Sequence, residues 1–205
     1  GLIFLAIAAY TFWHYDQLPA IPFGIVALAS AVWAAGYAFE LTMPEIADKV
    51  FWMRLRFIAN NIIMPLPWLA TTLAYTHQSH LIKRHYAAML FVVPLISVLV
   101  ILTSEYHRLF RYDFYVTTIE GTVSVLRYSN GIWNWFALAN AYLLNTVSTW
   151  IILGRSLRNA TPFHARRTWL IIGSSTIQVF AEVAFQLKLL PVPGYSFTPT
   201  LGILV

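Results

Sequence analysis

The chain has 205 residues, of which 59% are hydrophobic and only 10% are charged, and its mean hydropathy is +0.66. Because an ordinary soluble domain is about one quarter charged, this composition excludes a typical water-soluble fold and predicts a helical protein that crosses a membrane several times. There is no cysteine, which excludes disulfides and thiolate chemistry, and the net charge of +5 lies in short clusters between apolar runs, which is typical of membrane orientation rather than of nucleic-acid binding.

Seven apolar runs follow one another along the chain, and most are near the length of about 20 residues that a membrane-spanning helix needs. They cover residues 1–14, 21–41, 50–76, 86–103, 132–153, 168–187 and a last run that begins near Ser196. Pro65 and Pro67 in the third run predict a kink there. We therefore expect residues 1–205 to form one all-α membrane domain, a seven-transmembrane helix bundle whose first and last helices are truncated.

One long connection, residues 104–131, separates the fourth and fifth runs. Its stretch RYDFYVTTIEGTVSVLRYSNG places β-branched and aromatic residues on both sides of Glu120-Gly121, a pattern typical of a β-hairpin. The connection therefore predicts a small two-stranded cap on the outer, extracytoplasmic side of the bundle, turning near Glu120-Gly121.

Basic residues in the connections predict how the helices are oriented. The connections between runs three and four and between runs five and six share one side and carry Lys83, Arg84, Arg155, Arg158, Arg166 and Arg167. The other side carries Lys49, Arg108, Arg111, Arg127 and Lys188, mostly spread over the long connection. Because the dense cluster flanks runs five and six directly, we expect the N-terminus outside and the C-terminus in the cytoplasm, in a plasma (inner) membrane.

Four charged residues share one depth in the predicted bundle. Arg54 and Arg56 lie about 6–9 Å from the outer end of the third run, at 1.5 Å per residue. Glu182 in the sixth run and Glu40 in the second run lie near the same end. Because an unpaired charge in hydrocarbon is costly, we expect Arg54 or Arg56 to lie within salt-bridge reach of Glu182 or Glu40.

Amide side chains extend this layer along the same helical stripes, since Asn60 lies four residues from Arg56. We predict a ligand cavity in the outer third, bordered by runs three, five and six, that takes a carboxylate or another acceptor-rich group. Its candidate binding residues are Arg54, Arg56, Asn60, Asn61, Gln178, Glu182, Glu40 and Asn134. Two simpler interpretations stay open: the arginines extend to the lipid headgroups, and the amides hold the helices together.

Other chemistry has little support in the sequence. His77 and His80 have a spacing seen in metal ligands, but no nearby carboxylate joins them. No arrangement of catalytic residues is present, and the last apolar run contains no lysine that could carry retinal. We therefore expect a chain without catalytic residues, metal or cofactor.

Several stretches resemble a known family. The stretch GYAFELTMPEIADKVFWMRLRFI…MPLPWLATTLAYT (36–76) is similar to the seven-transmembrane N-terminal sensor region of bacterial histidine kinases and related diguanylate cyclases. Further similar stretches are FVVPLISVLVILTSEYHRLF (91–110), GIWNWFALANAYLL (131–144) and ARRTWLIIG…LPVPGYSFTPTLGIL (165–204), in the same order and spacing.

The resemblance implies a membrane sensor whose seventh helix continues into a cytoplasmic kinase or cyclase domain beyond residue 205, with dimerisation through that output region. The expected partners are an unknown small-molecule ligand and the lipid bilayer, and no nucleic acid. A small membrane transporter or channel is the alternative, although no inverted repeat or matched pair of broken helices is visible in the sequence.

Overall fold

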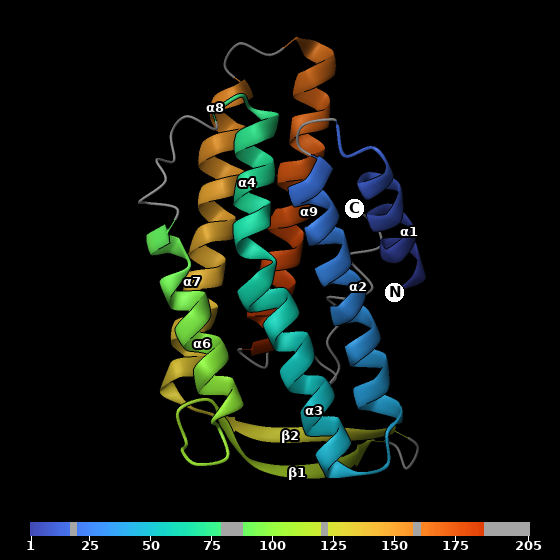
Figure 1. The fold of residues 1–205 in the computed structure, drawn as a ribbon, viewed down its shortest axis with the longest axis vertical. Coiled ribbons are helices and arrows are strands. Elements are labelled where there is room, and N and C mark those ends of the chain that lie inside the picture. The colour runs from blue at the N-terminus through green and yellow to red at the C-terminus, as the bar shows by residue number, and fades with distance from the viewer. Residues whose placement is uncertain (17–19, 79–87, 120–122, 158–160, 187–205) are drawn as a thin grey trace.

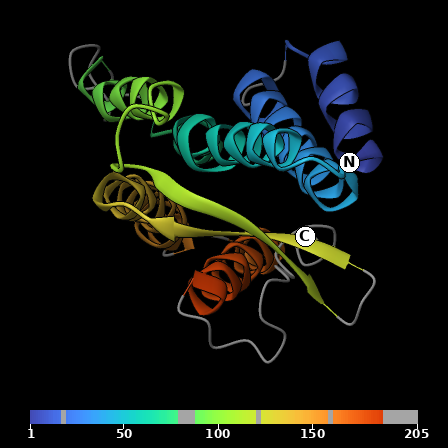
Figure 2. The ribbon, with the colours of Figure 1, turned by 90° about the horizontal axis from the view of Figure 1, so that it is seen from below.

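The computed structural model describes residues 1–16, 20–78, 88–119, 123–157 and 161–186. Helices that run roughly side by side form a bundle, and a two-stranded sheet lies across one of its ends (Figure 1, Figure 2). We call this end, marked by β1 (Arg111–Ile119) and β2 (Val123–Asn130), the hairpin end. The helical elements are α1 (Leu2–Trp13), α2 (Ala20–Thr42), α3 (Ile46–Phe57), η1 (Ile58–Ile63), α4 (Pro65–Tyr75), α6 (Val92–Leu102), α7 (Ile132–Thr146), η3 (Val147–Leu153), α8 (Gly154–Ser156) and α9 (Pro162–Gln186).

The described part of the chain contains three helical runs that are long and apolar enough to cross a membrane, Ala20–Thr42, Ile46–Tyr75 and Ile132–Ser156. They agree within a few residues with the predicted runs 21–41, 50–76 and 132–153. Two shorter apolar helices, Leu2–Trp13 and Ala88–Leu102, lie in the first and fourth predicted runs. The protein is thus mostly helical, while the start of the fourth run and the whole seventh run lie outside the described residues.

The third predicted run changes its helical geometry just before its prolines. Residues Ile58–Ile63 form a π-helical segment, and the amide of Met64 donates to the carbonyl of Ala59 at 3.0 Å. Because Pro65 and Pro67 have no N–H, the carbonyls one turn earlier lose their usual donors, and a wider turn is one way to accommodate this. The helix axis changes direction between α3 and α4 (Figure 1), where this π-helical segment lies. The predicted kink is thus found at the prolines and in the turn before them.

The predicted hairpin is confirmed. Strands β1 and β2 pair antiparallel from Arg111 opposite Asn130 to Ile119 opposite Val123, and the turn between them lies outside the described residues. The register is interrupted between Tyr112 and Tyr115, where Asp113 has a φ of 54°. This β-bulge bends the first strand as it leaves the helical bundle.

The hairpin end has an apolar core to which both the helices and the strands contribute. Its buried residues are Met53, Phe57, Ile62, Ile101, Phe110, Leu126, Ala137 and Leu138. A second buried cluster joins α4, α7 and η3 farther from the hairpin, with Leu69, Leu73, Leu144 and Ile152. The sheet is therefore part of the packed structure rather than an appendage.

Helices α2 and α3 approach each other closely at a buried glycine. A β-carbon at Gly36 would lie 3.1 Å from Cβ of Arg56 and 3.4 Å from the carbonyl oxygen of Trp52. Such a contact is too tight unless the helices separate by a few tenths of an ångström. The missing side chain at Gly36 therefore lets Arg56 lie beside α2.

We expect Gly36→Ala to lower the melting temperature by several degrees, because the added methyl group forces α2 and α3 apart. The matched control is Gly154→Ala, since a β-carbon there has no heavy atom within 4 Å and alanine favours a helix over glycine. Thermal unfolding of both variants in lipid nanodiscs measures the difference. Equal melting temperatures would show that the contact at Gly36 is not tight.

Candidate functional site

A buried ion pair joins α2 to α3 near the hairpin end. Arg56 donates from Nε to Oε2 of Glu40 at 2.5 Å and from Nη2 to Oε1 at 3.4 Å. Only 12% of the Arg56 side chain and 4% of the Glu40 side chain are exposed. The guanidinium also lies 5.0 Å from the ring centre of Tyr37. The prediction that one of the two arginines reaches Glu40 or Glu182 is confirmed for Arg56 and Glu40.

A fully buried lysine adjoins this pair. The ammonium group of Lys49 donates to three backbone carbonyls, those of Glu40 at 2.7 Å, Ser124 at 2.9 Å and Leu41 at 3.4 Å. Two of these carbonyls belong to the last turn of α2, where no further amide of the helix is available to them, and the third belongs to β2. Lys49 therefore ties the end of α2 and the hairpin to the first turn of α3.

The hairpin is also tied to α7 by a buried arginine. Arg111, at the start of β1, is 3% exposed and donates from Nε to Oδ1 of Asn134 at 3.0 Å. Its guanidinium lies 4.3 Å from the ring centre of Tyr128 and 4.7 Å from that of Phe57. Aromatic faces attract the cation and replace part of its hydration. Asn134, a predicted ligand residue, thus lies against the hairpin.

Arg54 has different surroundings from Arg56, because two residues along a helix turn a side chain by about 200°. Its Nη1 donates to Oε1 of Glu105 at 3.1 Å, and the carboxylate of Glu105 is 69% exposed. The Nε atom of Arg54 is buried and has no hydrogen-bond partner within the part of the chain that the structure describes. Arg54 therefore has donor capacity that its exposed partner does not use.

Arg54 lines a polar cavity of about 730 Å³ at the hairpin end. The cavity is bordered by α3, by the connection that follows α6 and by the start of β1. Its lining residues are Ala47, Val50, Phe51, Arg54, Ser104, Glu105, Tyr106, His107, Arg108, Arg111, Tyr112, Asp113 and Phe114. Three arginines and one histidine face two carboxylates, so the walls favour an anionic or acceptor-rich group.

The model of one protein family matches the entire chain. This family is the N-terminal 7TM region of histidine kinase, and the match covers residues 1–205. The chain belongs to this family. No curated protein and no solved structure matches the chain.

Family membership, together with the apolar helices, indicates a membrane location and the role of a sensory input region. Such a 7TM region is the non-catalytic input part of its receptor, which agrees with the sequence-based expectation of a chain without catalytic residues.

The polar cavity that contains Arg54 is a different one from the cavity predicted from the sequence. The expected cavity lies between runs three, five and six, whereas the one that contains Arg54 lies between run three and the connection around the hairpin. Asn60 and Asn61 are half-buried in η1 and do not line it, and Glu40 and Arg56 pair with each other outside it. The side chains of Gln178 and Glu182 lie outside the described part, so their role stays a prediction.

The remaining expectations concern metal ions. Among the described residues, no group of three or more histidine, cysteine, aspartate or glutamate side chains could hold a metal ion. His77 follows α4 with a φ of 56°, whereas His80 lies outside the described residues. The geometry of the described residues thus adds no support for a metal site at these two histidines beyond their spacing in the sequence.

Two residues of the site were missed by the sequence reasoning, Lys49 and Arg111, because both count as loop charges in the orientation rule. A signal for Lys49 was present: only three residues, 43–45, separate α2 from α3, so the first turn of α3 must lie beside the last turn of α2. No comparable signal exists for Arg111. Its aromatic neighbours are far apart in the sequence: Phe57 belongs to α3, Phe110 precedes β1 and Tyr128 lies near the end of β2.

Replacing Lys49 with methionine is expected to loosen the hairpin, because the three carbonyls lose their common donor while the apolar volume is kept. Amide hydrogen exchange in β2 should become at least several-fold faster than in the wild type. The control Arg155→Met removes a positive charge from an exposed residue in α8, at the end opposite to the hairpin (Figure 1). Unchanged exchange in the Lys49 variant would mean that other contacts hold the sheet in place.

Proposed function

We propose that this chain is the transmembrane input domain of a bacterial signal-transduction receptor, which senses a ligand at the hairpin end and relays its binding to a cytoplasmic kinase or cyclase. In this proposal all seven predicted runs span the inner membrane, the hairpin end is extracytoplasmic and the C-terminus is cytoplasmic. The family match supports the sensory role. The main support for ligand sensing is the polar cavity lined by Arg54, whose buried Nε donates no hydrogen bond among the described residues.

The proposed ligand is a small molecule with at least one carboxylate. A carboxylate can accept two parallel hydrogen bonds from one guanidinium, which matches the free donor capacity of Arg54. The present partner, Glu105, is mostly exposed, and an exposed ion pair contributes only about 0.2–1 kcal/mol. A ligand carboxylate would therefore displace Glu105 at little cost and form a drier, stronger pair with Arg54.

The proposed relay starts from the walls of the same cavity. Arg54 lies on α3, which continues through η1 into α4, and Arg111 connects the cavity to Asn134 on α7. A ligand that prefers one arrangement of α3, the hairpin and α7 shifts the population toward that arrangement by its differential affinity. The shift then reaches the cytoplasmic side through the long helices and the seventh run.

If the ligand is a carboxylate, substitutions of Arg54 and of Glu105 should change its affinity in opposite directions. With citrate and succinate as probes, Arg54→Gln should weaken binding at least about tenfold, since a hydrogen bond to a charged group contributes about 1.5–3 kcal/mol. Glu105→Gln should strengthen binding, because it removes the internal competitor. Arg155→Gln, at the end away from the hairpin, should leave affinity unchanged. Calorimetry on the full-length receptor in nanodiscs measures all three.

Binding that is equal in the wild type and the Arg54 variant, or an unchanged affinity in the Glu105 variant, would contradict this site. The sensory role has a separate readout. The full-length receptor in proteoliposomes should change its incorporation of phosphate from ATP, or its synthesis of a cyclic dinucleotide, when the carboxylate is added. A carboxylate that binds without changing either output would contradict the relay and leave the binding site standing.

A further inference from the structure

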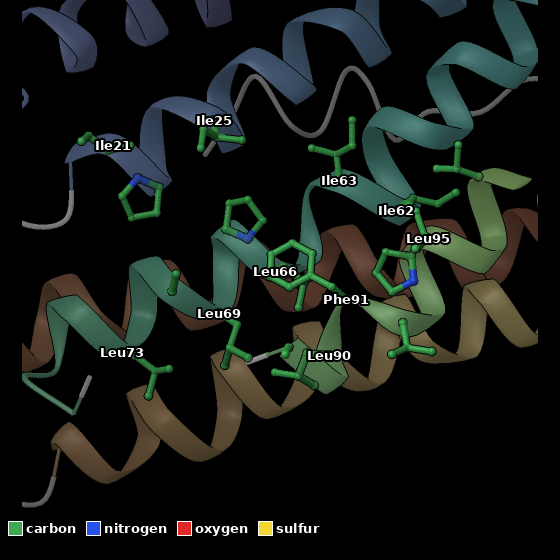
Figure 3. A pocket seen from close by; sticks show the side chains of 17 residues that line it. Ile21, Ile25, Ile62, Ile63, Leu66, Leu69, Leu73, Leu90, Phe91 and Leu95 are labelled. Carbon is green, nitrogen blue, oxygen red and sulfur yellow. The ribbon is translucent and has the colours of Figure 1, made fainter. Parts of the chain in front are cut away.

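A second cavity lies on the other side of the π-helical segment from the hairpin end. It measures about 860 Å³ and is formed by α2, by the helix from η1 into α4, and by α6 together with the turn before it (Figure 3). Its lining residues are Ile21, Pro22, Ile25, Ile62, Ile63, Leu66, Pro67, Leu69, Ala70, Leu73, Ala88, Leu90, Phe91, Val92, Pro94, Leu95 and Val98. Every one of these side chains is apolar, so the walls offer no side-chain hydrogen bond and no charge.

The depth of this cavity matches one leaflet of a bilayer. Ile21 lies in the first turn of α2 and Leu73 in the last turn of α4, both at the end away from the hairpin (Figure 1). From Leu73 to Ile62 the lining runs for about 16 Å along the helix, at 1.5 Å per residue. Half of the hydrocarbon core is about 15 Å thick. The cavity thus extends from one membrane interface to the middle of the bilayer.

The cavity is open at its rim and closed at its inner wall. Phe91 and Leu95 on one side and Ile63 on the other are largely exposed among the described residues, whereas Ile62 and Leu69 are only 5% and 6% exposed. In a membrane, the open rim faces the lipid chains, and the inner wall lies behind the first layer of side chains. An apolar chain could enter sideways from the bilayer.

The depth and the lining identify the occupant. An extended acyl chain is about as long as one leaflet of hydrocarbon is thick, which matches the length of the lining. A non-helical peptide would leave its backbone amides and carbonyls without partners against these walls. A single hydrocarbon chain has no such unpaired groups. We propose that the cavity binds one acyl chain of a phospholipid from the leaflet away from the hairpin.

The bound chain has a direct route to the helix irregularity. Its end would contact Ile62 and Ile63, which belong to the π-helical segment before Pro65. An acyl chain that reaches this depth packs differently against a π-helical turn than against a regular α-helical turn. If it binds one form more tightly, it shifts the equilibrium of this segment toward that form. The length of the acyl chain thereby biases the sensor. This site is separate from the carboxylate cavity and does not depend on it.

Photolabelling in bilayers tests the proposal. The full-length receptor is placed in phosphatidylcholine vesicles that contain a phosphatidylcholine with a diazirine near the end of one acyl chain, then irradiated and digested for mass spectrometry. The expected labels lie on Ile62 and Leu69, which bulk lipid does not reach from outside, and this labelling saturates as the probe fraction rises. Labels on the exposed Leu99 of α6 should instead rise in proportion to the probe.

Variants that fill the cavity sharpen the test. Ala70→Phe projects a ring into the cavity and should reduce the labels on Ile62 and Leu69 at least about tenfold, and Ala88→Phe does the same from the opposite wall. The matched control Ala139→Phe, at an exposed position of α7 outside the lining, should leave them unchanged. Two filling variants keep the test decisive if one of them fails to fold.

Four results would overturn the proposal. Labels confined to exposed residues, or labels on Ile62 and Leu69 that never saturate, would show that bulk lipid contacts the groove without specific binding. Undiminished labels in a folded filling variant would place the chain elsewhere. Displacement of the labelled phospholipid by an equimolar amount of free palmitic acid would mean that the occupant is a fatty acid. Labels that resist palmitic acid support the phospholipid chain.

Discussion

The structure depends on the neutralisation of Glu40, a carboxylate that is almost completely removed from solvent where α2 packs against α3. An isolated buried charge costs several kcal/mol, so Glu40 requires cationic groups that are themselves held in place. Arg56 supplies a two-point contact, and the ammonium of Lys49 lies on the backbone carbonyl of the same glutamate. Gly36 leaves the space that this arrangement needs. From it follow the contact of α2 with α3 and the attachment of the hairpin.

The arginines at positions 54 and 56 consequently have different roles, although they are close in the sequence and lie at similar depth. Arg56 faces α2 and serves the packing of the bundle, whereas Arg54 lines a cavity and pairs with the exposed Glu105. The helical twist alone separates them. A residue that stabilises the bundle and a residue available to a ligand thus lie within one turn of α3.

Much of this arrangement could be predicted, and the limits have physical causes. Three apolar runs agree within a few residues with long apolar helices of the described part, because bilayer thickness fixes their length, whereas α9 begins at Pro162, six residues before the predicted sixth run. The shared depth of the charged residues predicted that Arg54 or Arg56 pairs with Glu40 or Glu182, because charge in hydrocarbon needs a partner, and the pair of Arg56 with Glu40 is one of these. The burial of Lys49 and Arg111 was missed, since long basic side chains in connections usually reach water. The polar cavity beside Arg54 was not predicted, because the path of residues 104–110 follows no hydrophobic period.

A double-mutant cycle on Glu40 and Arg56 tests the central claim most directly. The free energy of unfolding is measured in mixed micelles by titration with denaturing detergent, for the wild type, Glu40→Gln, Arg56→Gln and the double variant. If the pair is the interaction on which the hairpin end depends, each single variant loses stability, and the double variant loses less than the sum by about 1–3 kcal/mol. Additive losses, with a coupling below about 0.5 kcal/mol, would contradict the account.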